Sequence, residues 1–244
     1  MENLKILFMG DSITALNTSE RGWVGYFNEI IKPQHFENVA VSGASWEDKS
    51  ATVYDGNPFF DHKDPKMYNN VIGNQVEKVL NNKAQGNAGF ADFDLIIIAA
   101  GTNWGDDITT EYIGRIKEQF FDNDDKPLPL DKVNRKTWAG AMRYAYEKLR
   151  AEYTNAVICY CSPIQAAEDS RPYEIIRAKS TVMEEICKRI SDVTFIDTFL
   201  CGICGCYETR DQNGRDLIDG LHPNINGAKK IAKYNANAIR RIML

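Results

Sequence analysis

The sequence predicts an α/β fold, a three-layer α/β/α sandwich in which helices cover both faces of a five-stranded parallel sheet. Short apolar runs alternate with longer amphipathic stretches along the chain, and this alternation is typical of parallel strands joined by crossover helices. The clearest run, DLIIIAA at residues 94–100, is apolar throughout, as expected of a strand covered on both faces. No repeat, low-complexity tract or linker interrupts the sequence, so we expect one domain over residues 1–244.

The first part of the chain contains three predicted strands and two predicted helices. Residues 5–9, KILFM, form a short apolar run and predict a buried strand. Residues 21–32 carry their large apolar side chains on one side of a helix and predict that structure. A second strand is predicted over residues 37–41, a helix over residues 71–81 and the central strand over residues 94–100.

The second part of the chain continues the same alternation. Residues 135–153 have apolar residues at helical spacing, and residues 156–161 follow as the fourth strand. A helix over residues 173–190 leads to the fifth strand at residues 193–196. The closing helix is predicted over residues 226–243.

Two segments are too long to be simple connections. Residues 45–70 mix aromatic side chains with prolines, glycines and acids, and residues 120–134 contain two prolines. Loops of this length usually have a function or mobility of their own. Ordinary surface insertions remain the alternative for both segments.

Composition and charge exclude several classes of protein. The chain is 43% hydrophobic and 26% charged, which is typical of globular proteins and not of disordered ones. Its net charge is −5 and its basic residues are scattered, so we expect no nucleic-acid partner, because such binding needs a concentrated basic surface. No apolar stretch has the length that spans a bilayer, and residues 1–5 show no leader pattern. We therefore expect a soluble, cytoplasmic protein without a membrane partner and leave its oligomeric state open.

Six cysteines are present, and three of them lie close together as Cys201-Gly-Ile-Cys204-Gly-Cys206. A chain of this length does not need disulfides for stability. Zinc thiolates commonly come in C-x₂-C pairs, but a structural zinc site needs four ligands, and no second pair with similar spacing exists. We therefore expect packed or inactive thiols and no metal, with zinc binding by this cluster as the alternative.

Chemically distinctive residues follow the predicted strands. Ligands of a parallel sheet bind beyond the carboxyl ends of its strands, so we expect these residues to meet at one edge. The segments are Gly10-Asp11-Ser12, Ser42-Gly43, Gly101-Thr102-Asn103-Trp104 and, near the C-terminus, Asp219-Gly220-Leu221-His222.

Together these segments supply the groups that acyl transfer requires. A serine hydroxyl such as that of Ser12 becomes a nucleophile when a base takes its proton, and His222 is the best candidate base. Asp219 lies three residues before it, so one turn can aim the carboxylate at the imidazole and fix its tautomer. The backbone N–H groups of Ser12 and Gly43 and the side-chain amide of Asn103 are candidate donors to the oxyanion of a tetrahedral intermediate.

The four segments resemble the motifs of the SGNH hydrolases, also called GDSL-type esterases: GDS, an isolated glycine, GxN and DxxH, in this order. The resemblance covers nearly the whole chain and implies a flavodoxin-like fold and ester hydrolysis without a cofactor. By position it implies that Ser12 is the nucleophile and an oxyanion donor. It also implies that Gly43 and Asn103 complete the oxyanion hole, and that Asp219 and His222 complete the triad.

The chain departs from that family at two positions. Ile13 stands where the family name has leucine, and Trp104 stands where an aspartate usually follows the asparagine. Two other classes of site fit less well. The G-x-S-x-G nucleophile elbow lacks its second glycine in residues 10–14, and no G-K-[ST] phosphate loop follows the first strand.

Each residue also has an ordinary structural interpretation. Asp11 and Ser12 are common helix caps, and Asn103 is a common turn residue. Among the three histidines we place His35 and His62 at the surface, with His62 as the only rival base. The ordered occurrence of all four segments favours the catalytic interpretation.

The substrate that we expect is a small acyl ester, namely an O-acetyl group on a carbohydrate. The reason is the aromatic content of the loop that begins at Trp46, together with Trp104, because aromatic faces suit sugars. We assign substrate binding to Asp11, Trp46 and Trp104. A lysophospholipase or thioesterase is the first alternative, since the same aromatic residues could line an acyl slot. A catalytically silent carbohydrate-binding module on the same fold is the second.

Overall fold

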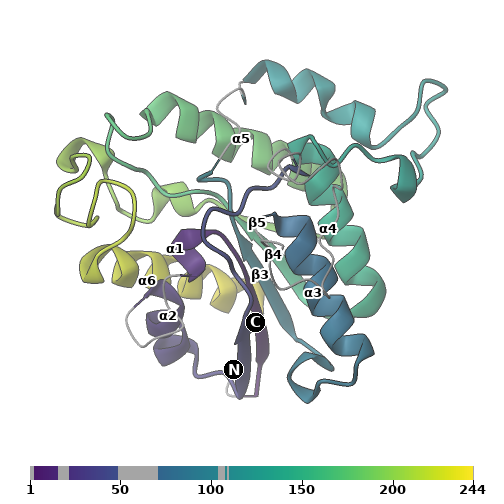
Figure 1. Cartoon of the computed structure of the whole chain (residues 1–244), viewed down its shortest axis with the longest axis horizontal. Coiled ribbons are helices and arrows are strands. Elements are labelled where there is room, and N and C mark those ends of the chain that lie inside the picture. The colour runs from purple at the N-terminus through teal and green to yellow at the C-terminus, as the bar shows by residue number, and fades with distance from the viewer. Residues whose placement is uncertain (1–2, 16–21, 49–70, 104–107, 109, 244) are drawn as a thin grey trace.

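A five-stranded sheet forms the centre of the computed structural model, which describes residues 3–15, 22–48, 71–103, 108 and 110–243 (Figure 1). All its strands are parallel, in the order β2-β1-β3-β4-β5. The strands are β1 (Lys5–Gly10), β2 (His35–Asn38), β3 (Leu95–Ala99), β4 (Val157–Cys161) and β5 (Thr194–Ile196). This order is the flavodoxin-like order, so the predicted fold class is confirmed.

Helices cover both faces of this sheet. The α-helices are α1 (Ser12–Ala15), α2 (Trp23–Ile31), α3 (Ile72–Ala84), α4 (Trp138–Glu152), α5 (Tyr173–Ile190) and α6 (Ile225–Ile242). The 3₁₀-helices are η2 (Ala88–Phe90), η3 (Thr110–Gln119), η4 (Leu130–Lys132), η5 (Thr198–Leu200) and η6 (Gly205–Tyr207). Each predicted helix is present, with ends that differ by a few residues. The helix predicted from residue 135 begins at Trp138 because Thr137 caps it, with its side-chain oxygen accepting a hydrogen bond from Gly140 N at 3.1 Å.

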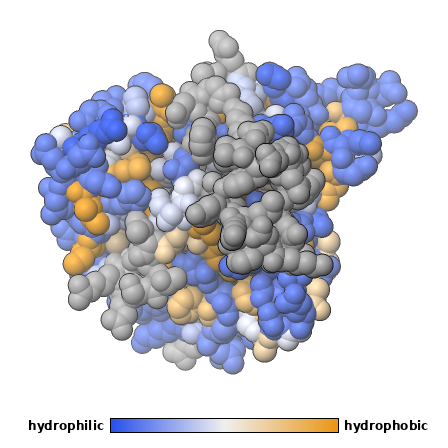
Figure 2. Space-filling model, in the orientation of Figure 1, coloured by the Kyte–Doolittle hydropathy of each residue, from blue (hydrophilic) through white to orange (hydrophobic). Residues whose placement is uncertain are grey.

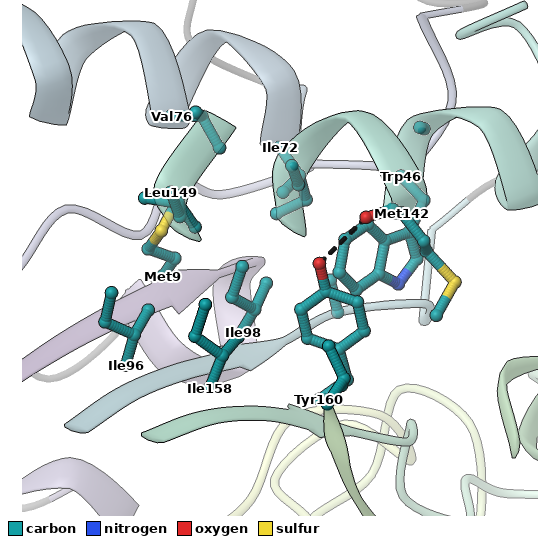
Figure 3. Close-up of a cluster of buried hydrophobic side chains, with 14 of the residues drawn as sticks. Met9, Trp46, Ile72, Val76, Ile96, Ile98, Met142, Leu149, Ile158 and Tyr160 are labelled. Atoms are coloured by element: carbon teal, nitrogen blue, oxygen red, sulfur yellow. Dashed lines mark hydrogen bonds between the residues drawn. The ribbon is translucent and has the colours of Figure 1, made fainter. Parts of the chain in front are cut away.

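The core has two parts, one on each face of the sheet. Successive side chains of a strand point to opposite faces, and the fully buried neighbours Ile97 and Ile98 accordingly belong to different clusters. The cluster that contains Ile98 packs against α3, α4 and α5, and Figure 3 shows part of it. The cluster that contains Ile97 packs against α2 and α6. Burial on both faces explains why the central strand is apolar without interruption.

The edge strand β2 begins two residues earlier than predicted and ends three residues earlier, over His35–Asn38 in place of residues 37–41. Its residues are partly exposed, so the apolar run that marks a buried strand is absent there. Beyond Asn38 the chain stays beside β1, because Val39 N donates to Phe8 O at 2.9 Å and Val41 N donates to Gly10 O at 3.1 Å. This extension carries residues 42–45 to the carboxyl end of the sheet.

The long segments differ in how far they can be described. Most of residues 45–70 lie outside the described residues. Residues 120–134 form an irregular arm with one antiparallel bridge, between Phe121 and Pro127, and it projects from the body at the upper right of Figure 1. The coloured part of the face in Figure 2 is mostly hydrophilic, with separated hydrophobic patches. Within the described ranges, none of the helices combines the length and the apolar character that a membrane span requires.

Candidate active site

A tight strand-to-helix turn positions Ser12. Gly10 ends β1 with φ of +152°, and a Cβ atom there would lie 2.1 Å from Ala99 O of β3, so the close approach requires glycine. Asp11 follows, and its Oδ1 accepts a hydrogen bond from Ile13 N at 3.0 Å across the start of α1. Ser12 is therefore the first residue of a short helix that begins immediately beyond the carboxyl end of β1.

Gln75 of α3 holds the same turn, although nothing in the sequence singled it out. The side chain is fully buried. Its Oε1 accepts a hydrogen bond from Gly10 N at 3.0 Å, and its Nε2 donates to Gly10 O at 2.8 Å. One amide thus satisfies both backbone groups of Gly10 and ties the end of β1 to α3. A glutamine beside Val76 in an amphipathic helix is the only signal in the sequence, and such a residue usually faces solvent.

Asp219 and His222 lie in a turn that its own hydrogen bonds close. Asp219 Oδ1 accepts from Leu221 N at 3.0 Å and from His222 N at 2.8 Å. The backbone returns on itself where Ile218 N donates to His222 O at 2.7 Å. The orientation of the carboxylate is therefore fixed by the same turn that presents the imidazole.

A second carboxylate, Glu208, anchors the chain just before this turn. It is buried, with 7% of its surface exposed. Its two oxygens accept hydrogen bonds from Asp216 N at 2.9 Å and Leu217 N at 3.1 Å. Glu208 could not be recognised from the sequence, because its partners lie eight and nine residues away in an irregular segment.

The two turns meet at the imidazole of His222. Its Nδ1 lies 2.8 Å from Asp219 Oδ2, and its Nε2 lies 2.9 Å from Ser12 Oγ. An ionised carboxylate can only accept a hydrogen bond, so Nδ1 carries the proton and Nε2 is left to accept the serine hydroxyl. This is the arrangement in which a histidine can take a proton from a serine while an aspartate stabilises the imidazolium.

The Asp219 carboxylate is suited to that position. Burial raises its pKa, but the hydrogen bonds from His222 N, the His222 ring and Leu221 N outweigh burial and leave the pKa below its ordinary value. The group is therefore ionised at neutral pH. An ionised partner is what an imidazolium beside it requires.

The candidate oxyanion donors lie beside Ser12. Gly43, with φ of +78°, and Asn103 line one cleft of about 520 Å³ together with Ser12 and the Asp219–His222 turn. Asn103 Nδ2 donates to Ala44 O at 3.1 Å. That bond orients the amide and uses one of its two N–H groups, so the other remains available to a ligand in the cleft.

Asp11 differs from its predicted role in substrate binding. It is 2% exposed, and its carboxylate oxygens accept from two backbone groups, Ile13 N at 3.0 Å and Thr102 N at 3.4 Å. Burial raises its pKa to about 6, although these hydrogen bonds and the nearby His222 lower it in part. The prediction that Asp11 binds substrate is therefore wrong. Its carboxylate joins the loop after β1 to the loop after β3.

Substrate binding by Trp46 requires an exposed aromatic face, and the structure does not provide one. The side chain is fully buried and packs against Tyr160, with ring centroids 4.9 Å apart (Figure 3). A sugar cannot stack on a ring that has no exposed face, so the structure contradicts substrate binding by Trp46. Trp104, the third residue assigned to the substrate, lies outside the described residues.

The remaining histidines and the cysteines lie apart from these contacts. His35 is at the surface, as predicted, where its Nε2 lies 3.1 Å from Glu37 Oε1. His62 lies outside the described residues. All six cysteines are free, and Cys204 Sγ lies 3.1 Å from Cys206 Sγ. In the part of the chain that the structure describes, no three His, Cys, Asp or Glu side chains are grouped as metal ligands would be.

Comparisons with solved structures identify the same fold in several hydrolases. A structure described as a possible lipase from Chitinophaga pinensis has a TM-score of 0.63 and 16% identity, covering 99% of this chain and 100% of that one. The carbohydrate acetylesterase Est24 from Sinorhizobium meliloti has a TM-score of 0.57 and 16% identity, over 98% of this chain and 100% of its own.

A catalytic mutant of the acetylxylan esterase Axe2 from Geobacillus stearothermophilus has a TM-score of 0.54 and 15% identity, over 98% and 96% of the two chains. A search among curated proteins gives no match. The model of the GDSL-like Lipase/Acylhydrolase family matches residues 8–230, a range that contains Ser12, Gly43, Asn103, Asp219 and His222. This chain therefore belongs to the GDSL-like lipase/acylhydrolase family.

Proposed function

We propose that this protein is a serine esterase that removes a small acyl group, with an O-acetylated carbohydrate as its substrate. The observation that carries the proposal is the pair of contacts made by one imidazole, 2.9 Å to Ser12 Oγ and 2.8 Å to Asp219 Oδ2. These contacts connect a nucleophile, a base and an orienting acid in one chain of hydrogen bonds.

The proposed reaction assigns a step to each of these groups. Ser12 Oγ attacks the acyl carbon as its proton passes to His222 Nε2, and Asp219 stabilises the imidazolium. The carbonyl oxygen becomes negative and is stabilised by the N–H groups of Ser12 and Gly43 and by the amide of Asn103. His222 then gives its proton to the departing alcohol, which leaves an acyl-enzyme on Ser12. A water molecule, deprotonated by His222, releases the acid and restores the serine.

The lining of the cleft supports a small acyl group. Ile218 and Leu221 are its apolar side chains among the described lining residues, and the others are small or polar. A long acyl chain needs a continuous apolar wall, so these two residues favour an acetyl or similar group.

Carbohydrate as the alcohol is supported by the structural neighbours. Two of them carry titles that name a carbohydrate acetylesterase and an acetylxylan esterase. Their sequence identities to this chain are 16% and 15%, and we propose a sugar alcohol on the basis of the shared fold. Trp46 does not support the choice of a carbohydrate, because its ring is buried.

The proposal predicts rapid turnover of p-nitrophenyl acetate and slow turnover of p-nitrophenyl octanoate. Acetate should also be released from acetylated sugars in a panel that includes lysophospholipids and acyl thioesters. Preference for octanoate and lysolipid would instead favour the lysophospholipase alternative. Binding of sugars without any turnover would favour the silent carbohydrate-binding module.

Replacement of one hydroxyl tests the chemistry directly. Ser12→Ala should abolish turnover and leave the circular dichroism spectrum and melting temperature close to wild type, because only the hydroxyl that contacts His222 is removed. Ser42→Ala is the matched control, since Ser42 lines the same cleft and has no assigned role; it should retain activity. Wild-type turnover by Ser12→Ala would refute the mechanism.

A further inference from the structure

A pair of thiols lies outside the proposed esterase chemistry. Cys204 and Cys206 flank Gly205 in the segment between β5 and the Asp219–His222 turn, and their sulfur atoms are 3.1 Å apart. A disulfide has its sulfur atoms about 2.05 Å apart, so bond formation requires a movement of about 1 Å. The other four cysteines are buried, whereas Cys204 is partly exposed and Cys206 is exposed.

The backbone holds this pair in position. Gly205 N donates to Gln165 Oε1 at 3.3 Å, and a Cβ atom on Gly205 would lie 2.0 Å from Ala166 O. Within the turn, Tyr207 N donates to Cys204 O at 3.1 Å. The hydrogen-bonded main chain keeps the two thiols next to each other. Little conformational freedom is therefore lost when they form a disulfide.

A cation stands close to the exposed thiol. The Arg215 guanidinium lies 4.3 Å from the ring centroid of Tyr207, the residue after Cys206. Its charge lowers the pKa of the Cys206 thiol, but the hydrogen bond with Cys204 has the larger effect and raises that pKa overall. Cys206 is therefore mostly protonated, and the thiolate that reacts is its minor form. The guanidinium, which also pairs with Asp216 Oδ2 at 3.0 Å, favours an approaching molecule with carboxylates.

We propose that Cys204 and Cys206 form a redox-active dithiol that is oxidised reversibly to a disulfide by an anionic, low-molecular-weight disulfide. The exposed Cys206, as thiolate, attacks the external disulfide and releases one small thiol. Cys204 then loses its proton, attacks Cys206 Sγ and displaces the second small thiol. The two protein thiols together lose two electrons and two protons. The external disulfide gains these electrons and protons and becomes two small thiols.

Cys201 is the competing partner, because Cys201-Gly-Ile-Cys204 has the C-x₂-C spacing. Its side chain is 7% exposed and belongs to the core cluster beneath α6. Burial raises the pKa of Cys201 to about 11, so it remains a neutral, packed thiol at physiological pH. The contact at 3.1 Å therefore selects Cys206 as the partner of Cys204.

The test uses the full-length native protein and oxidised glutathione. After incubation, free thiols are trapped with N-ethylmaleimide under denaturing conditions and the protein mass is measured. Because all six cysteines are free in the reduced protein, we expect two fewer N-ethylmaleimide adducts after oxidation, and both should return when reduced glutathione is added before trapping. Peptide sequencing by mass spectrometry should find N-ethylmaleimide on Cys201 and on the other buried cysteines, and none on Cys204 or Cys206.

Two variants distinguish the possible pairings. Cys206→Ser should abolish the intramolecular disulfide and leave at most one glutathione attached, whereas Cys201→Ala should still form it. A native protein that gains no disulfide in oxidised glutathione, or a disulfide that persists in Cys206→Ser, would overturn the proposal. Every readout is a mass, so the result does not depend on the proposed esterase activity.

Discussion

The amide of Asn103 has two N–H groups, of which one is bound to Ala44 O at 3.1 Å. The second can meet the substrate oxygen as that oxygen becomes negative. Asn103→Ala should therefore lower kcat about 10²- to 10³-fold, or roughly 3–4 kcal/mol, with little change in KM. Steady-state kinetics with p-nitrophenyl acetate measures both constants. A change in KM alone would place Asn103 in the cleft but outside the oxyanion hole.

Asp11 gives a prediction about stability and pH. An unfolded aspartate has a pKa of about 3.9, whereas burial raises the pKa of Asp11 to about 6 in the folded protein. The folded state therefore binds this proton more tightly, and the stability present below about pH 4 is lost as the pH rises through about 6. The shift corresponds to a loss on the order of 3 kcal/mol.

The side chain that Asp11→Asn introduces is neutral at every pH, so this variant does not lose the stability that wild type loses when Asp11 ionises. The free energy of unfolding of Asp11→Asn, minus that of wild type, should rise between about pH 4 and pH 7 and then level off. Urea unfolding across this range measures the difference. Asp219 is present in both proteins, so its opposite pH dependence cancels. A difference that stays constant with pH would show that Asp11 ionises normally.

The contact between the residues of the proposed triad could be predicted from the sequence because their signals are local. Asp219 and His222 are three residues apart, and Ser12 follows an apolar strand directly. Burial of Trp46 could not be identified in this way, since its ring packs against Tyr160 of β4, which is far away in the sequence. The same holds for Gln75, whose partner Gly10 is 65 residues away.

At the scale of the secondary-structure elements, α6 follows the Asp219–His222 turn directly. It begins three residues after His222, and its cap is Asn224, whose Oδ1 accepts from Asn226 N at 2.9 Å and Gly227 N at 3.2 Å. Asn224→Ala should lower the free energy of unfolding by about 1 kcal/mol. It should also lower kcat, by about tenfold for a further 1.4 kcal/mol of lost positioning, because the start of α6 helps to fix His222.

Thr137→Ala is the matched control, since Thr137 caps α4 and contacts no triad residue in the described structure. It should cost a similar free energy of unfolding and leave kcat near wild type. Equal kcat values in the two variants would mean that the cap of α6 does not position His222. Chemical denaturation and turnover of p-nitrophenyl acetate provide the two measurements.

Elements with strong periodicity were predicted well, and the edge strand was not. β3 is covered on both faces, so its apolar run marks it clearly. β2 lies at the edge with Phe36 45% exposed, and its pairing with β1 begins at His35, where no apolar run exists. Its start is marked by the pairing of His35 with Lys5 of β1, which is information from another part of the chain.

The molecule as a whole consists of two cores separated by one sheet. Ile97 and Ile98 are fully buried neighbours in β3 and belong to opposite clusters. Ile97→Val and Ile98→Val should each cost about 0.5–1.5 kcal/mol. Because the two side chains share no packing partners across the sheet, the double variant should equal the sum within about 0.5 kcal/mol. Urea unfolding of the four proteins measures the coupling, and a larger departure from additivity would show that the sheet transmits strain between its faces.

Ser12 and His222 are 210 residues apart in the chain and 2.9 Å apart in space. During synthesis on a ribosome, β1 therefore emerges well before the Asp219–His222 turn, and the strands between them can begin to pair around it. In the mechanism proposed above, the serine hydroxyl has no base until that turn has been synthesised. The order of synthesis thus separates the folding of the sheet from the assembly of the proposed triad.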